Sequence, residues 1–253
     1  MVLPAEWLQP DWAAGGSPGA AGVMTTRAGG VSAAPFDTFN LRAGLGDTAA
    51  AVAANHAALA LGVGCTPVFL DQVHGTRVVR LARADALPGA PVHQADASIT
   101  TAPGLACAVQ VADCLPVLFA APAGRGVGAA HAGWRGLAAG VLGATVQALC
   151  EAAACEPHEL QAWLGPCIGP QRFEVGPDVV DAFGAGSSVR FVPQTAGKWL
   201  ADLPSLARDS LHAAGVRAVS GGGWCTVSDA SRFFSYRRDR VTGRMAALVW
   251  IDR

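Results

Sequence analysis

Two histidines and one cysteine are the residues of this sequence whose types and positions best suit chemistry. His74, Cys114 and His131 each stand at the end of an apolar segment of strand length, beside a turn. Two imidazoles and a thiolate suit zinc, and three protein ligands leave a fourth position for water or substrate. Structural zinc sites usually rely on closely spaced ligand pairs, which these three residues do not form. We therefore predict that they share one metal ion in a catalytic site.

Two other interpretations use the same three residues. Cys114 could act as a nucleophile without a metal, with His74 or His131 as its base. A blue-copper centre also takes two histidines and a cysteine. The sequence has six histidines in all, and the remaining ones are too few for the multinuclear cluster of a multicopper laccase. Metal content and the effect of alkylating Cys114 distinguish a metal centre from a thiol nucleophile.

Five polar residues are candidates for binding substrate or phosphate. Arg135 stands in a glycine turn before an Ala-rich helix, where its guanidinium and the free N–H groups of the helix start suit an anion. Arg27, Asn40, Gln72 and Asp96 lie in otherwise apolar or glycine-rich surroundings, as residues that line a pocket or form a turn do. Asp96 is also a candidate for orienting a ligand histidine.

The apolar segments that end in these polar residues, together with the helices between them, indicate an α/β fold with a mixed sheet and helices on its faces. The segments beside His74 indicate a hairpin or a strand–turn–strand unit. A helix Ala49–Leu61, capped by Asp47 or Thr48, ends at Gly62. The other expected elements are strands at Val23–Thr26, Leu105–Ala112, Pro116–Ala121, Gly126–Ala132, Leu160–Leu164, Val216–Val219 and Ala246–Ile251, and helices from Leu137 to about Ala154, at Pro177–Phe183 and at Asp202–Ala214.

Composition excludes several classes of protein. The net charge of −1 and the absence of a basic stripe argue against a nucleic acid as partner. The longest apolar window, 104–123, contains Asp113 and two prolines, which argues against a membrane span, and the first residues do not resemble a signal peptide. The seven cysteines include no C-x-x-C pair and indicate reduced thiols in the cytoplasm. No linker divides the 253 residues, so we expect one domain spanning 1–253.

Nine segments of the chain resemble the YfiH-type laccase-domain family, whose members are also called multicopper polyphenol oxidases and are regarded as purine nucleoside phosphorylases. The combination of VADC with HAGWRG is especially specific. One departure is His56, where the family usually has Arg. The segments are TRAGGVS (Thr26–Ser32), FNL (Phe39–Leu41), DQVHGTRV (Asp71–Val78), QADASIT (Gln94–Thr100), VADCLPVLF (Val111–Phe119), AAHAGWRGL (Ala129–Leu137), LGPCIG (Leu164–Gly169), CT (Cys225–Thr226) and FFSYRRDRVTGRMAALVWI (Phe233–Ile251).

The resemblance implies a single-domain, three-layer α/β/α arrangement with metal ligands at His74, Cys114 and His131. The implied metal is zinc, with copper as the other candidate. The implied reaction is phosphorolysis of adenosine, inosine, guanosine and S-methyl-5'-thioadenosine, with phosphate as co-substrate and an associated adenosine deaminase activity. Small purine nucleosides are then the partners, and the sequence leaves the oligomeric state open and is compatible with a monomer.

Three further functions stay open at this point. Some family members are described as peptidoglycan editing hydrolases that act on a wrongly built UDP-MurNAc-amino acid precursor. Copper-dependent polyphenol oxidation, a laccase activity, is another enzyme function. A metal-dependent module that binds small molecules without turnover is the non-enzyme alternative.

Overall fold

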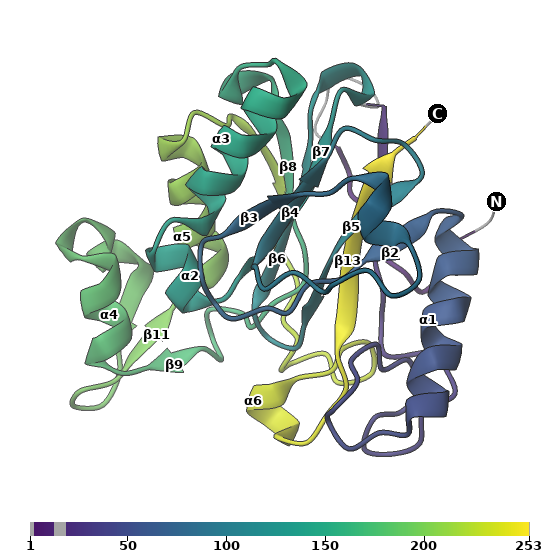
Figure 1. The fold of residues 1–253 in the computed structure, drawn as a ribbon. Coiled ribbons are helices and arrows are strands. Elements are labelled where there is room, and N and C mark those ends of the chain that lie inside the picture. Colours follow the sequence, from purple (N-terminus) through teal and green to yellow (C-terminus); the bar gives the residue numbers. More distant parts are fainter. Residues whose placement is uncertain (1–2, 13–18, 253) are drawn as a thin grey trace.

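Two β-sheets face each other at the centre of the molecule, and a computed structural model describes residues 3–12 and 19–252 (Figure 1). Both large sheets are mixed, and a small antiparallel sheet lies apart from them. The four-stranded sheet has the order β1 (Ala20–Met24), β13 (Met245–Ile251), β5 (Leu105–Val111), β2 (Thr66–Val68). The six-stranded sheet has the order β12 (Ala218–Gly221), β8 (Gln161–Leu164), β6 (Leu115–Ala120), β7 (Val127–Ala132), β4 (Ala97–Thr100), β3 (Val78–Arg80). The small sheet has the order β10 (Phe191–Pro193), β11 (Trp199–Ala201), β9 (Glu174–Val175).

Helices cover the outer faces of both large sheets (Figure 1). Helix α1 (Ala49–Val63) packs Leu59 and Val63 against the four-stranded sheet, and helices α3 (Val141–Ala153) and α5 (Leu203–Ala213) pack against the six-stranded sheet. The short helices are α2 (Trp134–Ala138), α4 (Pro177–Phe183) and α6 (Tyr236–Asp239), with 3-10 turns at Arg83–Ala86, Pro122–Gly124, Pro157–Glu159 and Ala185–Arg190.

Strand β5 shows why the central strands are apolar on both faces. Cys107 and Val109 point into the core between the two sheets, whereas Ala106 and Ala108 point toward α1. This period of two is what a strand imposes on its side chains. A strand that is covered on both faces therefore reads as one continuous apolar run in the sequence.

The expected α/β class with mixed sheets is confirmed, and the β layer between the helices is two sheets thick. The central stretch supplies strands to both sheets, because β5 joins the four-stranded sheet and β6 joins the six-stranded one. The chain crosses between the sheets at Asp113 and Cys114, and Asp113 makes the turn with a φ of 95°. The crossing places Cys114 at the shared end of both sheets.

Three local expectations are wrong in detail. Of the two arrangements expected beside His74, the hairpin is wrong, because β2 pairs with β5 and β3 pairs with β4 in the other sheet, whereas the strand–turn–strand order is present. Helix α1 continues through Gly62, which lies against the Trp7 ring, and ends at Gly64, which adopts the left-handed conformation. The helix expected after Leu137 is split into α2 and α3 at Gly140, whose φ is 98°.

Helix α4 spans the expected Pro177–Phe183, and Asp202 caps α5 by accepting a hydrogen bond from the Ser205 backbone N–H. The expected single domain, 1–253, includes residues 1–2, 13–18 and 253, which lie outside the described part of the chain. Among the described residues, no helix combines the length and the apolar character that crossing a bilayer requires.

Candidate active site

His74, Cys114 and His131 come from three parts of the chain and lie together at one end of the sheets. Their candidate ligand atoms all lie within 4.8 Å of one another. The Cys114 Sγ is 3.7 Å from the His74 Nε2, and the two imidazole rings are 4.7 Å apart at 74°. His131 is buried on β7, Cys114 is half-buried, and His74 is exposed. These donors fit a zinc-like cation, with the exposed His74 side facing solvent.

Asp96, which precedes β4, holds two of these residues in place. Its fully buried carboxylate accepts the His131 Nδ1 hydrogen at 2.8 Å and the backbone N–H groups of Val73, His74 and Gly75 at 3.1, 2.9 and 2.7 Å. Three successive N–H groups can reach one carboxylate because His74 has a φ of 62°. With Nδ1 bound to Asp96, His131 presents Nε2 toward the site, the arrangement that carboxylates impose on metal-binding histidines.

The charges of Cys114 and His131 stabilise each other. Burial raises the pKa of the Cys114 thiol, but the charge and hydrogen bond of His131, with the hydrogen bond of His74, lower it to about 6. Burial lowers the pKa of His131, but the Cys114 thiolate and the Asp96 carboxylate raise it to about 9. Burial likewise raises the pKa of Asp96, and its hydrogen bonds outweigh this and lower it. A thiol that ionises this readily suits both metal binding and nucleophilic attack.

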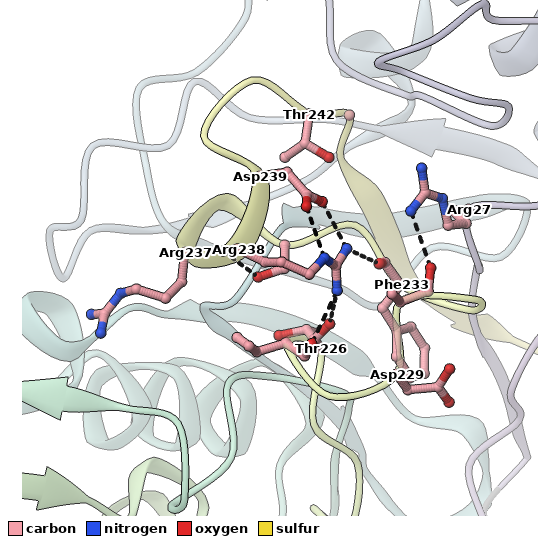
Figure 2. A network of polar contacts seen from close by, with 12 residues as sticks. Arg27, Thr226, Asp229, Phe233, Arg237, Arg238, Asp239 and Thr242 are labelled. Atoms are coloured by element: carbon pink, nitrogen blue, oxygen red, sulfur yellow. Dashed lines mark hydrogen bonds and ion pairs between the residues drawn. The ribbon is translucent and has the colours of Figure 1, made fainter.

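Asp113 connects the Cys114 turn to the C-terminal segment. Its carboxylate accepts a hydrogen bond from the Thr226 hydroxyl at 2.6 Å and another from the Arg237 backbone N–H at 2.6 Å. Neighbouring Arg238 ties this segment together: its guanidinium donates to the carbonyls of residues 226, 227 and 233 and pairs with Asp239 at 2.7 Å (Figure 2). The network fixes α6 beside the three candidate ligands.

Two adjoining cavities open at this site. The first, which we call the metal-side cavity, has a volume of about 380 Å³ and is lined by the three candidate ligands together with Arg42, Gln72, Gln110, Tyr236 and Arg244. The second, the aromatic cavity, has a volume of about 260 Å³ and is lined by Trp134, Arg135, Phe173, Tyr236 and Arg237. Cys114 and Tyr236 line both cavities, so a ligand in one would lie beside the other.

Arg42 and Arg244 give the metal-side cavity an excess of positive charge. Neither takes part in an ion pair with any residue of the described chain. Burial lowers the pKa of Arg244, and the nearby charge of Arg42 lowers it further. Two guanidinium groups that share a cavity without a carboxylate favour an anionic ligand.

The five other expected site residues lie in different places. Gln72 lines the metal-side cavity, where its side chain bonds to the Gln110 backbone, and Arg135 lines the aromatic cavity with its guanidinium over the Trp134 ring at 4.3 Å. Asn40 is fully buried beneath the metal-side cavity: its Oδ1 accepts the backbone N–H groups of Arg42 and Arg244 at 3.1 and 2.9 Å.

Asp96 is fully buried and reaches the site through the histidines. Arg27 lies at a separate cavity, where it pairs with Asp37 at 3.1 Å and donates to the Ala230 carbonyl (Figure 2 shows its side chain). An anion site was expected where Arg135 precedes a helix. That helix is α2, which contains Arg135 and has only five residues, Trp134–Ala138.

Four residues with polar side chains line the metal-side cavity but were not among those expected from the sequence: Arg42, Gln110, Tyr236 and Arg244. Arg42 is a polar residue in the otherwise mostly apolar loop segment 36–46, and Arg244 stands in the arginine-rich segment 232–244, but neither feature indicates that the two share a cavity. Tyr236 is the only tyrosine of the chain and stands in the arginine-rich segment 232–244, which is the signal that could have identified it.

Comparisons with known proteins identify the family of this chain. The family described as "Multi-copper polyphenol oxidoreductase laccase" matches residues 21–252. Purine nucleoside phosphorylase PA4543 of Pseudomonas aeruginosa is 51% identical over 97% of this chain and 98% of its own length. Purine nucleoside phosphorylase YfiH of Escherichia coli is 45% identical over 99% of this chain and 98% of its own length.

Two solved structures share the fold. Neisseria meningitidis protein NMB0706 is 45% identical and superimposes with a TM-score of 0.90 over 98% of this chain and 100% of its own. YlmD from Geobacillus stearothermophilus is 32% identical, with a TM-score of 0.89 over 99% of this chain and 100% of its own. The expected YfiH-type relationship is confirmed, and the chain belongs to the multi-copper polyphenol oxidoreductase laccase family.

Proposed function

We propose that this protein is a zinc-dependent purine nucleoside phosphorylase that cleaves adenosine, inosine, guanosine and S-methyl-5'-thioadenosine. The observation that carries the proposal is the convergence of His74, Cys114 and His131 beside a cavity with two arginines that form no ion pair in the described chain. A laccase would need further copper ligands, and the described residues form no second cluster of metal-binding side chains. The names of the relatives support the same activity.

Phosphorolysis requires phosphate to attack the anomeric carbon while the purine leaves, through an oxocarbenium-like state. Arg42 and Arg244 would bind the phosphate, and Asn40 would hold the two arginine backbones at a fixed separation. Bidentate guanidinium contacts orient a phosphate as well as bind it, which lowers the entropic part of the barrier. We therefore assign phosphate to the metal-side cavity and not to the turn at Arg135.

His74, Cys114 and His131 would hold the cation, which when bound supplies Lewis acidity at the wall of the metal-side cavity. Copper is the other candidate ion for this donor set. Asp96 holds the Nδ1 proton of His131, so a cation that binds at Nε2 would displace only the second proton, which the raised pKa keeps there at neutral pH. We include adenosine deamination in the proposal because the same cavity admits water beside the candidate cation.

The aromatic cavity would bind the purine. Trp134, Phe173 and Tyr236 offer aromatic surface, and Tyr236 and Cys114 also line the metal-side cavity. A nucleoside with its base on this surface would place its ribose near the phosphate site. Stacking of a base on an aromatic side chain is worth about 1–3 kcal/mol per base.

The test is product analysis with inosine and zinc-loaded protein. Hypoxanthine and ribose 1-phosphate are expected with phosphate present, and neither is expected without it. Cys114→Ala should lose this activity, whereas Cys65→Ala, which removes a half-buried thiol elsewhere, should retain it. Release of free ribose at a rate independent of phosphate would contradict the proposal.

Parallel assays address the other functions. Polyphenol oxidation is measured after copper loading, and amide cleavage is measured on a UDP-MurNAc-amino acid. Nucleoside binding without turnover would indicate a binding module. A metal-free protein with full activity that alkylation of Cys114 abolishes would identify Cys114 as a nucleophile instead of a metal ligand.

A further inference from the structure

A third cavity lies away from the candidate active site and contains two thiols. It has a volume of about 650 Å³ and is lined by one face of α3 from Gly143 onward, by the turn that follows α3, and by Ala214, which caps α5. Its lining includes Cys150, Glu151, Cys155 and Glu156. It shares no lining residue with the metal-side or the aromatic cavity.

The end of helix α3 brings the two thiols together. Ala154 adopts the left-handed conformation with a φ of 49°, and the backbone N–H groups of Ala154 and Cys155 both bond to the Cys150 carbonyl, the latter at 3.1 Å. This is the Schellman ending of a helix, which places the side chains on either side of the turn in contact. Cys150 and Cys155, both half-buried free thiols that line the same cavity, occupy the two positions that such a helix ending brings together.

The two thiols differ in their readiness to ionise. Burial raises the pKa of Cys150 to about 12, and the adjacent Cys155 raises it as well. Burial also raises the pKa of Cys155, but the hydrogen bond from Cys150 and the charge of Arg125 oppose this. Both pKa values lie above that of a free thiol, and the thiolate is the attacking species. Cys155, whose thiolate is disfavoured less, is therefore the attacking thiol of the pair.

Charge around the cavity favours some reagents over others. Glu151 and Glu156 line it and are exposed, and neither forms an ion pair within the described chain. Glu159, which is close by, pairs with Arg125 at 3.4 Å. The net field at the opening is therefore negative and attracts small cations more strongly than anions.

We propose that Cys150 and Cys155 form a dithiol exchange site that takes small cationic or neutral disulfides and closes to an intramolecular disulfide. The Cys155 thiolate attacks one sulfur of the small disulfide, forms a mixed disulfide and releases one thiol, which carries the proton from Cys155. Cys150 then attacks the Cys155 sulfur of the mixed disulfide. This step releases the second small thiol, which takes up the proton that Cys150 loses. The protein loses two electrons and two protons, and the small disulfide is reduced to two thiols.

The test exposes zinc-loaded protein to equal concentrations of cystamine, which is cationic, or oxidised glutathione, which is anionic. After acid quenching and alkylation, the protein is digested with a protease that cleaves after glutamate. Cleavage at Glu151 separates Cys150 from Cys155 in the sequence, so only a disulfide keeps their fragments joined. Mass spectrometry should find the joined fragments, formed roughly tenfold faster with cystamine, and salt should reduce this ratio.

Three variants make the roles separable. Cys150→Ser should stop at the mixed disulfide on Cys155, whereas Cys155→Ser should react much more slowly. Cys65→Ser, which removes another half-buried thiol, should behave as the wild type. Wild-type fragments that remain separately alkylated after cystamine treatment would overturn the proposal, and equal reaction rates of Cys150→Ser and Cys155→Ser would overturn the assigned order of attack.

Discussion

The Asp96 carboxylate provides the sharpest test of how the candidate metal centre is held. Its Oδ1 accepts hydrogen bonds from the His74 N–H and the His131 Nδ1, and its Oδ2 accepts them from the N–H groups of Val73 and Gly75. An asparagine replaces one of these oxygens with an NH₂ group, which cannot accept from an N–H donor. Either orientation of the Asp96→Asn amide therefore breaks two of the four hydrogen bonds and removes the negative charge.

The magnitude follows from these contacts. Hydrogen bonds to charged groups contribute about 1.5–3 kcal/mol each, so losing two costs about 3–6 kcal/mol, divided between folding stability and the geometry of the site. Removing a carboxylate that orients a metal-binding histidine typically weakens metal affinity by about 10–100-fold. That range corresponds to about 1.4–2.7 kcal/mol. We expect Asp96→Asn to lose metal affinity by this factor and to lower the melting temperature of the metal-free protein.

The matched control is Asp85→Asn. Asp85 also accepts hydrogen bonds from a histidine, His93 at 2.7 Å, and from a backbone N–H, but it lies outside both cavities of the site. Zinc affinity is measured by competition with a chromogenic chelator at a temperature where each variant is fully folded. Wild-type zinc affinity in folded Asp96→Asn would refute the positioning role, and an equal loss in Asp85→Asn would show that the effect is not specific to the site.

Three further predictions address the cavity, the C-terminal segment and stability. Arg244→Ala should raise the KM for phosphate by about 10–100-fold, since charged hydrogen bonds are lost, while Arg125→Ala should leave it unchanged in initial-rate assays. Thr226→Val removes the hydroxyl that donates to the buried Asp113 carboxylate. It should lower the free energy of unfolding, measured by urea denaturation, by about 1–3 kcal/mol. Burial raises the pKa of Asp47, but three hydrogen bonds outweigh it and lower the pKa below its unfolded value. The ionised Asp47 therefore stabilises the protein above the ordinary aspartate pKa, and this stabilisation is lost as the pH falls through the lowered pKa of the folded state. Asp47→Asn should accordingly be less stable than the wild type at pH 7 and equally stable in strong acid. Thermal unfolding of both proteins across that pH range measures the convergence, and a constant gap would contradict it.

Local patterns predicted much of the fold because they report on the backbone itself. The apolar runs of β5, β6 and β7 were placed to within a residue or two, and α4 begins with a proline that suits the first turn of a helix. The division of the strands between two sheets was not predictable in the same way. Pairing partners of β2 and β3 lie far along the chain, and an apolar run does not say which sheet covers it.

In the candidate site, too, residues could be identified by their type, but contacts between distant segments could not be predicted. His74, Cys114 and His131 were identified by their types and by their positions at strand ends, and the structure brings them together. The anion-binding side was placed at Arg135 because a turn before a helix is a local signal. Arg42 and Arg244, which we propose for this role, both donate a backbone N–H to buried Asn40, which lies 204 residues before Arg244 in the sequence. A single buried amide thus joins two distant backbone segments whose arginines line one cavity. The same amide predicts that Asn40→Ala, although it removes no residue from the cavity wall, should raise the KM for phosphate together with any loss of stability.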